Sequence, residues 1–467
     1  MRNFIALISV CLCFIVHAQS DSLANVLRFD EYLGYVKKFH PIVKQAELVI
    51  DESQAKLMKS RGAFDPKIDV DYDRKKFKGT EYFDKLNGTF KIPTWFGIEL
   101  KANFEENSGD FLNPEAFVPE DGLYSAGVSV PIARGLLIND RMASLKQARL
   151  FREQAKADRD IYVNNLLFEA SKVYFKWLRA YNELRLFENF LTNAELRYRG
   201  ILRGVELGEN AQIDATEARI ALNNRKLSLE QARIKMLKAS LELSTFLWLD
   251  NNIPVELQTK VIPDVDTEPI VDTTFDINQL RNVEVIIDEH PKLLSLDYKR
   301  QSLNVEKRLK ANMLLPRVDL EYNFLTETPD IGRSFNTTEY KGGLNVSMPL
   351  FLRKERGDLK LAKIKLRDTE FEIDATRVNL QNKINGLKQE LDSYVTQNEI
   401  TVQMVGDYQQ MLVAEERKFQ LGESSLFLVN SRESKLIEGQ LKAIEIQNKF
   451  FNTKAKLFNS LAVNPEL

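Results

Sequence analysis

Two periodicities of apolar residues run along the chain, and each predicts a different kind of element. The stretches between prolines 131 and 254 and between prolines 349 and 465 contain no proline and carry apolar side chains at heptad spacing. Because proline breaks helix interiors, both are predicted to form very long coiled-coil helices; over residues 136–206 such a helix would be ~105 Å long at about 1.5 Å per residue. In the first stretch the repeat runs through Val163, Leu167, Ala170, Tyr174, Trp177, Tyr181 and Leu184. Past Gly208 the repeat resumes and is broken only at Arg225.

The second pattern, an alternation of apolar and polar residues, surrounds the remaining prolines and predicts strands. It covers residues 68–73 and 124–130 in the first half of the chain and 318–324 and 344–348 in the second. Apolar residues on one face and polar residues on the other suit a strand that lies between lipid and a wet lumen. A soluble, half-buried sheet gives the same periodicity and is the alternative.

The first half has a longer connection between its two strands. Pro66 and Pro131 are separated by 65 positions, whereas Pro316 and Pro349 of the second half are separated by 33. The extra length, within residues 80–106, contains a further alternating pair of segments. This pattern fits either an extracellular hairpin or additional barrel strands, and it does not decide between them.

The two halves repeat each other. Matching segments recur in the same order: 40–41 with 290–291, 64–72 with 314–322, 128–132 with 346–350, and 207–209 with 421–423. Four ordered matches, with length changes only between them, indicate an internal duplication. Each half is predicted to contain a helix, two strands, a long helix, a glycine turn and another helix. His40 and His290 precede prolines at the repeat-related helix starts, where a structural or capping role is favoured over metal binding.

The composition matters mainly for the classes of protein that it argues against. The 467 residues carry 65 basic and 67 acidic side chains, which argues against a nucleic-acid partner, and the mean hydropathy of −0.31 argues against a polytopic helical membrane protein. Three histidines and two cysteines leave little for a metal centre or a thiol nucleophile. No phosphate-binding loop, zinc-protease motif or Ser-His-Asp pattern occurs, so the sequence predicts no enzyme, no cofactor and no metal site.

Residues 1–18 have the features of a secretory signal peptide: a basic head at Arg2, an apolar run over residues 4–16 and small residues before position 19. Both cysteines, Cys11 and Cys13, lie in this run, so the mature chain is predicted to lack a thiol. An exported chain without a long apolar run can cross a membrane only with β-strands. Four strands cannot close a barrel, so several copies would have to pool their strands.

A signal peptide, two homologous halves, two strands per half and long coiled-coil hairpins resemble the TolC family of outer-membrane efflux ducts. The most specific segments are 419–425, with the sequence Phe-Gln-Leu-Gly-Glu-Ser-Ser, and 207–209, which resemble the family's glycine turns. The resemblance implies a mainly helical fold with membrane β-structure: a homotrimer in which four strands per chain build a 12-stranded outer-membrane β-barrel, continued by an α-helical barrel through the periplasm of a Gram-negative bacterium.

The resemblance also implies what the protein does and with which partners. Family members are passive channels for efflux or type I secretion that dock on a periplasmic adaptor (membrane fusion) protein, which links them to an inner-membrane pump of the RND, ABC or MFS class. The alternative from another class is a periplasmic coiled-coil scaffold without a pore. The chain is expected to divide into a signal peptide (1–18), an N-terminal equatorial segment with the first helix (19–65), the first barrel strands (66–132), the first coiled-coil hairpin (133–250), an equatorial linker (251–289), the second-repeat helix (290–315), the second barrel strands (316–350) and the second hairpin with the C-terminus (351–467).

Candidate functional residues gather at the two glycine turns, which are the expected periplasmic tips. Adaptor docking is expected at Leu207, Gly208, Glu209, Leu421, Gly422, Glu423 and Ser424. Closing the duct would bring the tips together, so that Asp214 and Glu217 form rings of carboxylates that attract cations. The alternative is an ordinary helix N-terminal Asp and a solvated Glu.

The gate of the second half is expected to differ from that of some relatives. Those family members carry aspartates and a Tyr–Arg lock, whereas the equivalent places here hold Leu428 and Ser431, with Phe419 and Ser424 in the lock positions. The resemblance therefore implies a more apolar closed gate without an inherited ionic lock.

Overall fold

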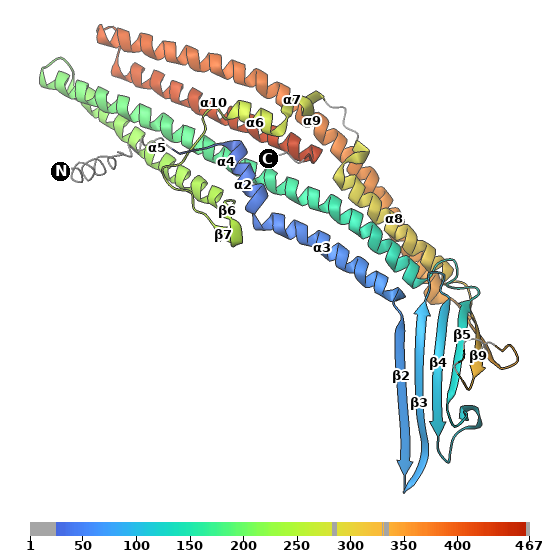
Figure 1. Ribbon diagram of the computed structural model, residues 1–467. Coiled ribbons are helices and arrows are strands. Elements are labelled where there is room, and N and C mark those ends of the chain that lie inside the picture. The colour runs from blue at the N-terminus through green and yellow to red at the C-terminus, as the bar shows by residue number, and fades with distance from the viewer. Residues whose placement is uncertain (1–24, 283–286, 329, 331–335, 464–467) are drawn as a thin grey trace, which may run out of the picture.

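The computed structural model describes residues 25–282, 287–328, 330 and 336–463. The predicted signal peptide lies outside the described residues. Long helices run side by side through most of the molecule, and a six-stranded sheet extends from one end of them (Figure 1). Among the described helices, none has an apolar stretch long enough to cross a membrane.

Two helical hairpins form the part of the molecule farthest from the sheet (Figure 1). The first joins α4 (Asp140–Glu206) to α5 (Gln212–Ser244), and the second joins α9 (Arg353–Gln420) to α10 (Leu426–Leu461). Because α4 also packs on α10, the helices form one layer in the order α5, α4, α10, α9. At about 1.5 Å per residue, the 67 residues of α4 extend over ~100 Å, as the proline-free stretch predicts.

Two shorter helices continue this layer toward the sheet. α3 (Pro41–Arg61) packs on α4, and α8 (Pro291–Asn312) packs on both α4 and α9. Nδ1 of His40 and of His290 accepts the backbone N–H two residues on, at 3.2 and 3.1 Å, and the proline at the first helical position has no N–H to satisfy. The predicted capping role of the two histidines is confirmed.

The largest hydrophobic core surrounds the middle of the long helices. Aromatic rings from distant parts of the chain meet there: Phe275 stacks on Phe458 with ring centroids 4.5 Å apart, and Phe29 stacks on Phe175 at 5.0 Å. The short elements around this core are α2 (Phe29–Phe39), α6 (Thr267–Phe275), α7 (Ile277–Asn282), β1 (Val26–Leu27) paired with β8 (Ile262–Pro263), and β6 (Trp248–Leu249) paired with β7 (Ile253–Pro254). They form a belt around the helical layer.

The large sheet joins both repeats. Its strands are β2 (Lys67–Phe77), β3 (Thr80–Pro93), β4 (Glu99–Ser108), β5 (Leu123–Pro131), β9 (Arg317–Thr326) and β10 (Tyr340–Ser347). They lie in the order β10, β9, β5, β4, β3, β2, and every neighbouring pair is antiparallel.

Within the described residues the sheet has six strands: the four that the repeats predict and the two of the hairpin over residues 80–106. The long connection of the first repeat is part of the sheet, because β3 and β4 pair with each other and also with β2 and β5 on either side. Each of these strands therefore has its backbone groups paired along both edges.

Candidate functional site

The two glycine turns at the free ends of the helical hairpins have the same backbone geometry. Gly208 and Gly422 both have a φ of +77°, the left-handed conformation that the sequence predicts for them. In each turn the glycine N–H bonds to the carbonyl three residues back, and the next N–H bonds to the carbonyl five residues back. This is a Schellman motif, which satisfies the last carbonyls of the incoming helix. The preceding Leu207 and Leu421 are 64% and 67% exposed.

The two predicted carboxylates of the first tip lie in the first turns of α5, and both are half-buried. Asp214 Oδ2 accepts the backbone N–H of Ala211 at 3.2 Å, so it caps its own helix. Glu217 Oε1 accepts a hydrogen bond from Asn430 Nδ2 at 3.1 Å, which joins α5 to α10 of the other hairpin. Both carboxylates therefore have a structural role at the tip: Asp214 caps α5, and Glu217 connects α5 to α10.

The predicted residues of the second tip have different environments. Phe419 packs into the small cores beneath the tip, whereas Leu428 and Ser431 lie exposed on α10. Ser424 Oγ donates to Glu415 Oε1 at 2.6 Å. This hydrogen bond, together with the neighbouring Arg432, lowers the pKa of Glu415. Glu423 is exposed, as is Glu209 in the first turn.

A buried cluster of charges below the tips was not identified from the sequence. Arg197 of α4 forms ion pairs with Glu416 of α9 at 2.9 Å and with Glu433 of α10 at 3.2 Å. Arg225 of α5 reaches the other oxygen of Glu433 at 3.1 Å and also donates to Ser434. The Glu433 side chain is only 1% exposed. One carboxylate thus links two arginines from the first hairpin to the second, and all four long helices meet in this cluster.

One of these residues, Arg225, stands out in the sequence itself. Arg225 interrupts the heptad of the helix after Gly208, and a charge at a seam position requires a partner across the seam. Its partner lies 208 residues away in the sequence, on a helix of the other repeat. The sequence gives no indication of that pairing.

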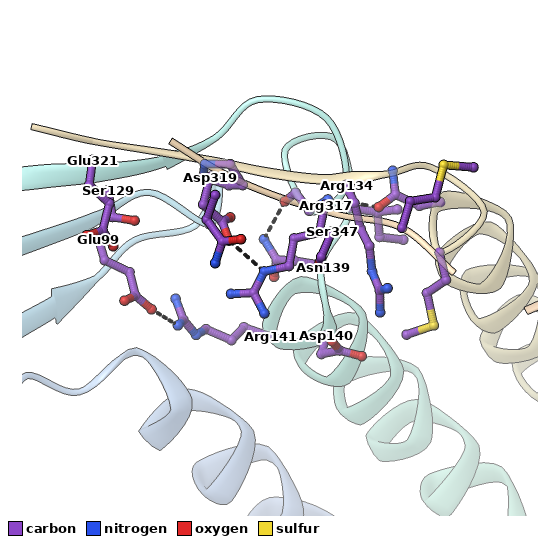
Figure 2. A pocket seen from close by; sticks show the side chains of 18 of the residues that line it. Glu99, Ser129, Arg134, Asn139, Asp140, Arg141, Arg317, Asp319, Glu321 and Ser347 are labelled. Carbon is purple, nitrogen blue, oxygen red and sulfur yellow. Dashed lines mark hydrogen bonds and ion pairs between the residues drawn. The ribbon is translucent and has the colours of Figure 1, made fainter. Parts of the chain in front are cut away.

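A polar cavity of about 880 Å³ lies where the sheet meets the helices (Figure 2). The polar face of the sheet lines one side, and the start of α4 and the end of α8 line the other. The ion pairs in it are Glu99 with Arg141, Lys101 with Glu321 at 2.7 Å, and Arg317 with Asp319 at 2.6 Å. Charge is therefore balanced within this wall. In the part of the chain that the structure describes, no group of three His, Cys, Asp or Glu side chains is placed to hold a metal ion.

Comparison with known proteins gives one family and one fold. Residues 283–462 match the family model described as outer membrane efflux protein. No curated protein matches the chain.

Three solved structures represent the fold. The CmeC outer membrane channel of Campylobacter jejuni has a TM-score of 0.66 and 13% identity, with 93% of this chain and 85% of that chain covered. The outer membrane protein VceC of Vibrio cholerae has a TM-score of 0.63 and 12% identity, covering 93% and 96%. The open-state MtrE outer membrane channel of Neisseria gonorrhoeae has a TM-score of 0.65 and 12% identity, covering 93% and 89%. These likenesses confirm the predicted fold class over nearly the whole chain.

Proposed function

Because residues 283–462 match the outer membrane efflux protein family and 93% of the chain shares the fold of outer-membrane channels, we propose that three copies form a passive duct. This duct carries substrates of a tripartite efflux or secretion system across the periplasm and the outer membrane. The observation that carries this proposal is that the two ends of the molecule have different structures. A sheet with one apolar and one polar face lies at one end, and two repeat-related turns lie about 100 Å of helix away. An outer-membrane channel requires an amphipathic sheet, and a contact deep in the periplasm requires turns that lie far from that sheet.

The duct itself would do no chemical work. A periplasmic adaptor protein and an inner-membrane pump of the RND, ABC or MFS class would supply energy and choose the cargo. The exposed tip residues, Leu207 and Glu209 in one turn and Leu421 and Glu423 in the other, are available for docking to the adaptor. Two exposed leucines at repeat-related positions give each chain two similar docking points.

The proposed gate lies at the same tips. Asp214, Glu217, Leu428 and Ser431 would meet their symmetry mates when the tips converge, and Phe419 would support them from the core beneath. The Glu433 cluster ties the two hairpins of a chain to each other. Each chain would therefore move its two tips as one unit, and opening would occur between chains.

The proposal is tested by purifying the mature protein from outer membranes in detergent. We expect trimers that dissociate on heating in a denaturing gel, and ion conductance after insertion into a planar bilayer. A monomeric or dimeric protein that stays soluble without detergent and conducts no ions would refute the duct and favour the scaffold.

Docking is tested with photo-crosslinking side chains placed one at a time. At Leu207 or Leu421 they should capture the periplasmic adaptor. At Leu137, which is 79% exposed but lies at the sheet end of the helices, they should not. Capture at Leu137 alone would place the adaptor elsewhere.

A further inference from the structure

The six described strands form a single amphipathic wall. Following the ladder sideways from β2 to β10, one row of directly paired residues is apolar throughout: Ile68, Phe90, Ala102, Ala126, Phe324 and Tyr340. The neighbouring row on the opposite face is polar or glycine throughout: Lys67, Lys91, Lys101, Gly127, Asn323 and Lys341. Up to the row of Gly88 and Phe104, the β3–β4 hairpin therefore obeys the same division of faces as the strands on both sides of it, and the charged Asp84 and Glu106 on the apolar face lie beyond that row.

The shared division of faces indicates that the β3–β4 hairpin is part of the barrel wall and not an extracellular loop. A hairpin in water above the membrane has no need to present its apolar side chains on the same face as its neighbours. Here the apolar side chains of β3 and β4, such as Phe90 and Leu100, continue the apolar face of β5 without a change of register. The polar side chains of the hairpin continue the opposite face, where Lys101 pairs with Glu321 of β9 at 2.7 Å.

The sheet is also tilted as a barrel wall must be. The apolar row starts at the second residue of β2 and ends at the eighth residue of β10, both counted from the helix end. It thus climbs six residues over five strand-to-strand steps. With a rise of about 3.3 Å per residue and strands about 4.8 Å apart, this climb corresponds to a tilt of roughly 40°. Membrane barrels have strands tilted by about 35–45°.

Among the strands that the structure describes, β2 and β10 are the two edges of this wall and each has a partner on one side only. Every residue of β2 and of β10 is exposed. Unpaired backbone groups at a sheet edge are not tolerated in lipid. Because the strands alternate in direction, β2 and β10 run antiparallel to each other, so β10 of one copy can pair with β2 of the next and keep the alternation.

We propose that β10 of each copy pairs with β2 of its neighbour, and that the trimer thereby closes an 18-stranded barrel in which the β3–β4 hairpin is wall. This inference rests on the proposed function, since it takes the trimer from there. At about 40° of tilt and 4.8 Å between strands, 18 strands give a circumference of roughly 113 Å. A ring of twelve helices spaced by about 8–10 Å has nearly the same circumference, roughly 96–120 Å. The barrel would thus continue the helical part without a step.

The side chains of the two edges select a register. Pairing must keep Ile68 and Val346 on the apolar face, which leaves registers that differ by two residues. With Val346 opposite Ile68, Lys341 lies opposite Asp73, whereas a shift of two residues in one direction would place Lys341 opposite Lys75. A shift of two residues in the other direction would place Val346 opposite Pro66, which precedes β2 and has no N–H to donate. Like charges directly opposite destabilise a strand pair and opposite charges stabilise it. The favoured register therefore also places Gly343 opposite Asp71.

The first test asks on which side of the wall neighbouring residues of β3 lie. Because both cysteines precede the predicted cleavage site, Gly88→Cys and Thr89→Cys are single-cysteine variants of the mature trimer. A Cβ at Gly88 meets no atom within 4 Å. In lipid vesicles, a charged maleimide should label Thr89→Cys about tenfold faster or more, because the apolar face excludes the reagent. Equal labelling would show that the hairpin lies in water and would overturn the proposal.

The second test asks whether the edges meet. Under mild oxidation, the double variant Gly343→Cys with Asp71→Cys should form covalent trimers, and Gly343→Cys with Asp73→Cys should form several-fold fewer. As a control, Asn87→Cys with Glu105→Cys, which pair directly within one chain, should form no covalent oligomers. Conducting trimers without any link between β10 and β2 would overturn this inference and leave the duct intact. Absence of both trimers and conductance would overturn the proposed function itself.

Discussion

The buried charge cluster below the tips allows a sharp test, because one carboxylate serves two arginines. Glu433→Gln keeps the shape of the side chain and removes its charge. The variant leaves Arg225 without its ion pair and Arg197 with only Glu416. The side chains of both arginines are largely buried, at 12% and 15% exposed, so water screens their charges poorly.

The expected size of the effect follows from this geometry. Removing one partner of a buried ion pair typically costs about 3–5 kcal/mol. Because Arg197 keeps Glu416 at 2.9 Å, the lower end of that range applies, about 3 kcal/mol. That free energy corresponds to roughly a hundredfold increase in the population in which the two hairpins separate locally.

The assay is amide hydrogen exchange on the purified trimer. Peptides from α10 around residue 433 and from α4 around residue 197 should exchange faster in Glu433→Gln, by about the hundredfold given above when opening is the limiting equilibrium. The matched control is Glu416→Gln. Its side chain is 40% exposed and its loss leaves Arg197 paired to Glu433, so the expected cost is below about 1 kcal/mol.

Two outcomes would refute this reasoning. If Glu433→Gln and Glu416→Gln exchange alike, Glu433 does not hold the hairpins together. A triple variant that replaces Arg197, Arg225 and Glu433 with Met, Met and Leu leaves no buried charge, and it should recover most of the lost protection. If it exchanges as fast as Glu433→Gln, the defect comes from packing and not from an unpaired charge.

Three further predictions concern the turns, the caps and the gate. Gly422→Ala should loosen the second tip by about 1–2 kcal/mol, because its φ of +77° disfavours a Cβ although no atom lies near one, and limited proteolysis at the turn would measure it. Burial lowers the pKa of His40 and of His290 in the folded protein. The two histidines therefore contribute their full stabilisation at a pH above about 6.5, their pKa in the unfolded chain, and this stabilisation is lost as the pH falls through the lower pKa of the folded state. His290→Asn, which retains a capping acceptor but does not titrate, should flatten the thermal stability between pH 7 and 5; an unchanged slope would exclude this histidine as the cause. Asp214→Ala with Glu217→Ala should weaken cation block of the single-channel current, and unchanged block would remove the carboxylate rings from the gate.

The sequence predicted those parts of the fold that local patterns determine. Heptad spacing and the absence of proline gave the long helices, and the repeated Leu-Gly-Glu gave the two turns with their left-handed glycines. The strand faces were also correct, because period-two alternation determines which side chains share a face. The predicted helix over residues 136–206 and α4 end at the same residue, and only the start differs, because Asn139 caps the helix before Asp140.

Two features lay outside the reach of local patterns. The alternation over residues 80–106 is the same for a hairpin in water and for a hairpin in a barrel wall. Only the pairing of its strands with β2 and β5 distinguishes the two arrangements. The charge cluster brings together residues from four helices of two repeats, so that its partners are fixed by packing and not by spacing. Arg225 was visible as an interruption of the heptad, but the residue that satisfies it was not.

The barrel and the tips together determine where the duct can select its cargo. A wall of 18 strands encloses a lumen that is wide at the backbone, roughly 36 Å across, and the ion pairs along it balance its charge. Such a lumen offers little discrimination between substrates. The tips are different, because the first repeat contributes carboxylates and the second contributes Leu428 and Ser431. A closed trimer would therefore carry gate carboxylates at the three tips of the first repeat and uncharged gate residues at the three tips of the second repeat. Cations would meet a gate with threefold symmetry, although the helical wall has six similar hairpins.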